Sequence, residues 1–213
     1  MKYLMGLESM KTAVFDLNLS SAICMKNLDK QQYQYEIAVP TLSAYAIEYS
    51  TLQLSGLTTF LHHSTLMDDK IEVHTKFRLE DKECKLVIHY HGIRDYALLF
   101  PSVKEVSLKN RLGEFYRETE FAFNEGIWLS FMLMCGGIFE GLLYSKIGKK
   151  LNFNQLIDLA HSSTLINDRA KNIMHNVRNY RNLVHANKHS APYVSRVDAM
   201  DTRAVLDSLI KAQ

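Results

Sequence analysis

Residues that break or cross-link regular structure are scarce in this sequence. It has three prolines, nine glycines and three cysteines among 213 residues, and no proline falls between residues 102 and 191. So few glycines and prolines exclude a linker or a disordered chain. Three cysteines without a CxxC pair exclude a disulfide framework and are typical of a reducing compartment. The first apolar stretch is too short and too interrupted for a signal peptide, so we expect an ordered cytoplasmic protein with buried thiols.

Several common catalytic motifs are also missing. The sequence contains no phosphate-binding glycine loop, GxSxG, HExxH or dinucleotide-binding glycine pattern, which excludes the commonest nucleotide-dependent and hydrolase classes. His89 and His91 have the spacing of a metal-binding pair on one strand face, but no third ligand follows from the sequence. We therefore predict no metal and no cofactor.

One long apolar run raises the question of a membrane. Residues 126–144, GIWLSFMLMCGGIFEGLLY, contain Glu140 as their only ionisable residue, and lysines follow. This length and flank fit a membrane span. Against a span, Glu140 would lie in or near hydrocarbon at a cost of about a few kcal/mol, and the centre of a helical domain is equally apolar all round. We favour a buried helix and no membrane association, with a single-span membrane protein as the alternative.

The hydrophobic period changes near residue 102. Before it, apolar and polar residues alternate in segments that predict strands, while residues 44–66 fit a helix or a strand. The strand candidates are residues 12–20, 33–40, 70–79 and 84–93, the last two joined by EDKE as a predicted β-hairpin.

After residue 102, apolar residues recur at helical spacing. This pattern predicts a bundle of four or five helices that ends with a helix near residues 198–211. We therefore predict an α+β fold, with a β-rich domain at residues 1–102 and a helical domain at residues 103–213.

Positive charge gathers in the helical part. Residues 141–196 hold nine Lys and Arg against two Asp, although the formal net charge of the whole chain is only +2. Such a local excess favours a phosphate-bearing ligand, and a solvated helix face explains it about as well.

The segment VRNYRNLVHANKH, residues 177–189, concentrates this charge. If residues 168–185 form one helix, the side chains of Arg178, Arg181 and His185 leave from one face. Guanidinium and imidazole groups on one stripe can bind phosphate oxygens and transfer a proton near neutral pH. The spacing alone favours a solvated helix end, where cations interact favourably with the helix dipole.

The same residues resemble the signature of the HEPN superfamily (the higher eukaryotes and prokaryotes nucleotide-binding fold). That signature is an Arg, a polar residue and a His after four to six intervening positions, which Arg178, Asn179 and His185 match with six. The preceding segments GGIFEGLLYSKIGKKL and NFNQLIDLAHSS resemble the order of HEPN helices, with Glu140 in the earlier apolar helix. The resemblance covers residues 124–213, and the first hundred residues resemble nothing that we can name.

The resemblance implies a HEPN-like helical bundle with a ribonuclease site. In active members, a 2′-hydroxyl attacks the adjacent phosphate without a metal, in a cleft completed by a second copy of the domain. Arg178 and His185 would be catalytic, with Asn179, Arg181 and Glu140 in support, although the choice between Arg178 and Arg181 stays open. RNA would be gripped through its backbone with little base readout.

The resemblance also implies a biological setting. It indicates a homodimeric toxin or phage-defence effector, in which the β-rich region recognises an antitoxin or another regulatory protein. The alternative is a catalytically inactive HEPN-like module that binds RNA or a protein partner, because many relatives have lost activity.

Overall fold

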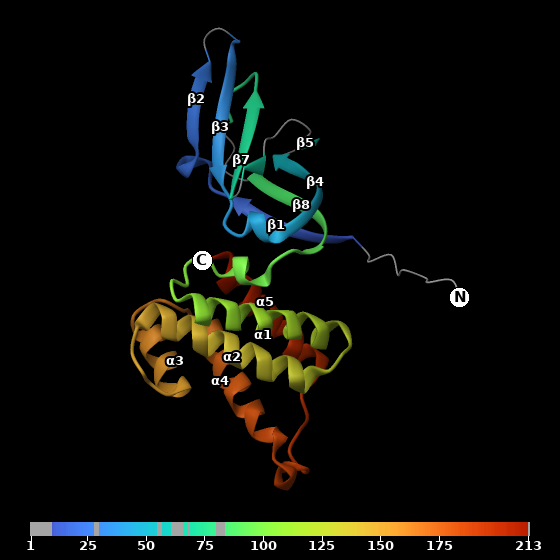
Figure 1. Ribbon diagram of the computed structural model, residues 1–213, viewed down its shortest axis with the longest axis vertical. Coiled ribbons are helices and arrows are strands. Elements are labelled where there is room, and N and C mark those ends of the chain that lie inside the picture. Colours follow the sequence, from blue (N-terminus) through green and yellow to red (C-terminus); the bar gives the residue numbers. More distant parts are fainter. Residues whose placement is uncertain are drawn as a thin grey trace, which may run out of the picture. The chain divides into compact units, whose positions relative to one another are not determined.

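The computed structural model describes residues 10–27, 30–54, 57–60, 66–67, 69–79 and 84–212. The chain divides into two compact units, residues 1–95 and 96–213. Strands build the first unit and α-helices the second, so the fold class is α+β as predicted (Figure 1). The division falls a few residues before the expected boundary at residue 102.

The described residues of the first unit form two antiparallel sheets of four strands each. One sheet has the order β1-β8-β4-β5 and the other the order β2-β3-β7-β6. The strands are β1 (Lys11–Leu17), β2 (Ile23–Asn27), β3 (Gln32–Ala38), β4 (Tyr45–Leu54), β5 (Leu57–Phe60), β6 (Leu66–Met67), β7 (Lys70–Thr75) and β8 (Cys84–Ile93).

Alternate residues of both sheets meet in one apolar core. Every second side chain of a strand points to the same face, so each alternating segment presents one apolar face for burial. The cluster takes Phe15 from β1, Ile88 from β8, Tyr35 from β3 and Ile71 from β7. The two sheets therefore pack face to face as a sandwich.

The predicted hairpin of residues 70–79 and 84–93 is wrong. Both segments contain strands, but β7 pairs with β3 and β6, whereas β8 pairs with β1 and β4. The turn that we expected at residues 80–83 lies outside the described residues. The physical reason is that burial of an apolar face selects the sheet, and this long-range choice overrides a short connection. Residues 45–54 and 57–60, left open between helix and strand, form β4 and β5.

Five α-helices are described in the second unit, after a short 3₁₀ turn at Tyr96–Leu99. The last helix agrees with the prediction for residues 198–211. The helices are α1 (Val106–Asn124), α2 (Trp128–Ile147), α3 (Phe153–Ser162), α4 (Asp168–Tyr180) and α5 (Arg196–Lys211).

The apolar run forms α2 and lies in the bundle. Among the described residues, α2 is the one helix long and apolar enough to cross a membrane, and half of its apolar window is buried. Gly137 and Gly141 let α1 approach closely, because a Cβ atom at Gly141 would lie 2.6 Å from Leu112 Cδ2.

The cysteines only partly follow the expectation of buried thiols. Cys84 and Cys135 are buried, but Cys24 is exposed on β2, and none of the three described cysteines forms a disulfide bond. Burial raises the pKa of the Cys135 thiol far above its usual range, so this cysteine is inert packing rather than a nucleophile.

Candidate functional site

The motif segment does not form the single helix that we expected over residues 168–185. The α-helix ends at Tyr180, and Arg181–Val184 continue as a 3₁₀ turn. His185 follows in an extended conformation with φ −80° and ψ 125°. Asn182 and Val184 have lower helix propensity than the residues typical of a helix interior. A 3₁₀ turn at the end of the helix also gives hydrogen-bond partners to carbonyl groups of the last turn.

Three of the motif side chains nevertheless line one cleft. Arg178, Arg181 and His185 surround a hollow of about 1080 Å³, together with Glu140 from α2. Asn179 is exposed and is not among the residues that line the cleft. The remaining lining residues are Leu133, Asn152, Phe153, Asn154, Gln155, Asn182 and Val184.

Glu140 forms an ion pair with Arg181. The Arg181 Nη1 atom donates to Glu140 Oε2 at 3.3 Å, and the two side chains are 49% and 40% exposed. A carboxylate within an apolar helix needs such a partner, and the sequence led us to expect an Arg of the motif segment. In the part of the chain that the structure describes, Arg178 and His185 have no side-chain hydrogen bond or ion pair. The two arginines therefore differ, since Arg181 is paired and Arg178 is available to a ligand.

Close packing of α4 on α2 sets the position of these groups. Val177 and Met174 of α4 are fully buried, and Gly136 of α2 lies beneath them. A Cβ atom at Gly136 would lie 3.2 Å from Val177 Cγ1 and 3.8 Å from Arg181 Cδ. The absence of a side chain there brings the backbone of α2 close enough for Glu140 to reach Arg181.

Contacts with α5 fix the end of α4. Burial raises the pKa of the Tyr180 hydroxyl, and the adjacent Asp198 carboxylate raises it further. Asp198 caps the start of α5 together with Ser195, and the Ser195 hydrogen bond lowers the pKa of this carboxyl. The last α-helical residue before the 3₁₀ turn is thus held by a second helix.

The start of α3 forms another wall of the cleft. The Asn152 side chain accepts a hydrogen bond from the Gln155 backbone N–H at 3.0 Å, and Gln155 Oε1 accepts one from the Asn152 N–H at 3.1 Å. This reciprocal capping box fixes where α3 begins. It also places Asn154 beside the basic residues.

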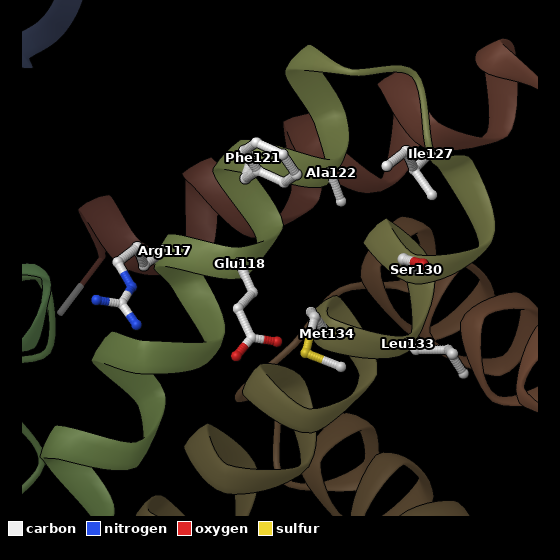
Figure 2. A pocket seen from close by; sticks show the side chains of 8 residues that line it. All are labelled: Arg117, Glu118, Phe121, Ala122, Ile127, Ser130, Leu133 and Met134. Carbon is white, nitrogen blue, oxygen red and sulfur yellow. The ribbon is translucent and has the colours of Figure 1, made fainter.

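A second, apolar hollow lies between α1 and α2 (Figure 2). It measures about 550 Å³ and includes Phe121, Ile127 and Met134, with Arg117 and Glu118 among its polar residues. Phe121 and Ile127 are 65% and 46% exposed. Leu133 lines both this apolar groove and the basic cleft, so the two surfaces adjoin.

A buried polar cluster in the same unit was not foreseen. Arg203 of α5 contacts Glu120 of α1, and its Nε atom lies 3.0 Å and 3.2 Å from the two carboxylate oxygens of Asp207. Its Nη2 atom lies 3.3 Å from the Tyr116 hydroxyl. The Arg203 and Glu120 side chains are only 22% and 10% exposed. The sequence signal was Glu120 itself, one helical turn after Tyr116 on the apolar stripe of α1.

The two histidines of the pair on β8 each contact another residue of the first unit. His89 stacks on Tyr49 with ring centroids 4.1 Å apart, and His91 Nε2 lies 3.2 Å from Glu48 Oε2. No group of three or more potential metal ligands occurs among the described residues.

Sequence reasoning also missed the amide side chains of the cleft. Asn182 lies one helical turn beyond Arg178, so its spacing was the available signal. Asn154 gave no comparable signal, because only the fold brings the start of α3 to the motif segment.

Comparison with known proteins finds no family model, curated protein or solved structure that matches this chain. The HEPN resemblance therefore rests on the motif residues and their context.

Proposed function

We propose that the protein is a metal-independent endoribonuclease of the HEPN type, acting in the cytoplasm as a toxin or phage-defence effector. The observation that carries the proposal is the basic cleft, in which Arg178, Arg181 and His185 meet. Among the described residues that line it, Glu140 is the one acidic residue. Cations of this kind attract phosphate groups, and the cleft is large enough for more than a single phosphate.

The chemistry follows from the groups in the cleft. The 2′-hydroxyl of RNA attacks the adjacent phosphorus, and the bond from phosphorus to the 5′-oxygen breaks. The products are a 2′,3′-cyclic phosphate and a 5′-hydroxyl end. A proton leaves the 2′-hydroxyl and a proton is added to the 5′-oxygen, and His185 takes part in this transfer as the imidazole of the cleft. Arg178 stabilises the charge that develops on the phosphorane oxygens.

The two arginines take different roles in this proposal. Arg181 is already paired with Glu140, so it orients the cleft and adds positive potential. Arg178 has no protein partner among the described residues and is free to bind the reacting phosphate. We therefore assign the catalytic role to Arg178.

A second copy of the chain completes the site in this proposal. The apolar groove between α1 and α2 adjoins the basic cleft through Leu133, so a protomer that covers the groove would bring its own cations close to the cleft. Exposed aromatic and aliphatic side chains such as Phe121 and Ile127 are typical anchors of such contacts.

One observation favours the inactive binding module as the second candidate. Asn179, the polar residue of the motif, lies outside the cleft, and His185 follows the helix in an extended segment. Such a module would still bind RNA through the same cations but would leave it uncut.

Cleavage in the presence of EDTA tests the proposed activity. We expect purified protein to cut single-stranded RNA at an unchanged rate with excess EDTA, because the proposed catalytic groups, Arg178 and His185, are side chains and need no metal ion. End-group analysis should find cyclic phosphate and 5′-hydroxyl ends. RNA binding without cutting would instead support the binding module, and a chelator-sensitive activity would contradict the metal-independent mechanism.

Replacing Phe121 with glutamate should weaken the proposed dimer. A charge in an apolar contact is costly to bury, so we expect the dimer dissociation constant to rise about tenfold or more. Light scattering after size-exclusion chromatography measures this change. Val106→Glu is the matched control, because Val106 is exposed on the same helix and does not line the groove. A dimer equally stable in both variants would exclude the groove as the interface.

A further inference from the structure

The basic cleft contains kinds of side chain that the binding of a phosphate alone does not require. Besides cations, it has carboxamide side chains and apolar side chains around one hollow of about 1080 Å³. A nucleotide has the same three parts, namely an anionic phosphate, a base with polar edges and apolar base faces. The lining therefore suits a nucleoside attached to the phosphate as well as the phosphate itself.

Only some of the carboxamides are available to a ligand. Asn152 and Gln155 are engaged in the capping box of α3, and Asn154 donates to Asp158 at 3.3 Å. The Asn182 carboxamide has no partner among the residues that the structure describes. It therefore presents a donor and an acceptor side by side, the pattern that binds adjacent donor and acceptor atoms on a base edge.

An apolar surface accompanies Asn182 in the same 3₁₀ turn. Val184 lines the cleft and is 52% exposed, so its side chain is accessible to a ligand. Leu133 of α2 lines the same hollow. A flat base face packed on these side chains would leave its edge for Asn182. Unstacked bases of single-stranded RNA are recognised through this combination of face and edge contacts.

We propose that Asn182 and Val184 form a nucleobase subsite for the nucleotide that flanks the scissile phosphate. Asn182 lies between Arg178 and His185 in the chain, and all three line one cleft, so a base bound there is close to the reacting phosphate. The inference rests on the proposed RNA-cleaving function and adds sequence preference to it. It replaces the expectation of little base readout.

Binding to RNA homopolymers tests the subsite. The full-length His185→Ala protein, which should bind without cutting, is titrated into fluorescein-labelled oligo(A), oligo(C) and oligo(U), and anisotropy is recorded. We expect the tightest and weakest homopolymers to differ about fivefold or more in Kd, since a good carboxamide contact discriminates between bases by at least this factor.

Substitutions of Asn182 in the His185→Ala protein test whether this residue causes the preference between bases. Asn182→Ala should reduce the difference in Kd between the tightest and weakest homopolymers to about twofold or less. All three RNAs should still bind, because the contacts with phosphate remain. Asn182→Gln keeps the carboxamide and should keep a preference. Asn176→Ala is the matched control, since Asn176 is exposed on α4 and does not line the cleft.

The outcomes separate the two proposals. A preference that survives Asn182→Ala, or equal binding of the three homopolymers by the parent protein, would overturn the subsite and leave the nuclease intact. Failure of every RNA to bind would contradict the proposed function, and the subsite with it.

Discussion

Replacing His185 with alanine is expected to slow RNA cleavage by about 10²- to 10⁴-fold, the usual contribution of a proton-transferring side chain. The side chain is exposed and has no protein partner in the described part of the chain, so its loss should leave folding unchanged. The rate is measured on single-stranded RNA in EDTA, and circular dichroism checks the fold. Arg178→Ala should show a comparable loss, because Arg178 is the unpaired cation of the cleft.

The control for this prediction is His189→Ala. His189 is an exposed histidine in the same connection between α4 and α5, and it does not line the cleft. We expect this variant to cut RNA at the rate of the unaltered protein and to arrest growth of an expressing host in the same way. Equal cleavage by the His185, Arg178 and His189 variants would place the reaction elsewhere. RNA binding without cleavage by the unaltered protein would support the binding module.

The buried cluster around Arg203 gives the largest expected effect on stability. Arg203→Met leaves Glu120 and Asp207 without their cation in the helical bundle. Removal of one partner from a buried ion pair costs about 3 to 5 kcal/mol, so the unfolding free energy should fall by about this amount. Urea denaturation followed by circular dichroism measures the change.

The loss of unfolding free energy in Arg203→Met should depend on pH. Burial raises the pKa of Asp207 in the folded protein, and Arg203 opposes that rise. Without Arg203 the folded carboxyl would bind its proton still more readily than the unfolded one. A carboxyl whose pKa is higher in the folded than in the unfolded protein stabilises the fold while it is protonated, and this contribution is lost as pH increases. The unfolding free energy of the variant should therefore be closer to that of the unaltered protein at pH 5 than at pH 7.5.

Arg169→Met is the matched control. Arg169 lies on α4 and pairs with Asp201 of α5 at the surface, where both side chains are more than half exposed. Surface pairs contribute at most about 1 kcal/mol, so this variant should unfold almost as the unaltered protein does. Equal losses in the two variants would show that the buried cluster is no more important than a surface pair.

The sequence was a better guide to elements than to their partners. Alternation with a period of two located β8 at residues 84–93, because each strand must bury one face. Which strands pair depends on contacts between residues far apart in the chain, such as Lys11 and Tyr90. The closeness of β7 and β8 in the sequence carries no information on those contacts. The hairpin predicted from that closeness was therefore wrong.

The candidate site shows the same limit at the scale of single residues. The Arg and His spacing identified the side chains that line the cleft, and the apolar context of Glu140 indicated that it needs an Arg partner. The end of α4 at Tyr180 could not be located, since the 3₁₀ turn depends on packing against α2 and α5 as well as on local propensity. The Arg203 cluster was overlooked because Glu120 and Tyr116 lie on α1, and only the fold brings them to Arg203 on α5.

The pairing of β1 with β8 has a consequence during protein synthesis. Lys11 lies opposite Tyr90 and Leu17 opposite Cys84, so β1 leaves the ribosome long before its partner exists. At about 5 to 20 residues per second, the delay is on the order of several seconds. We therefore expect β1 to present an unpaired strand edge during that time, when it is open to pairing with other chains.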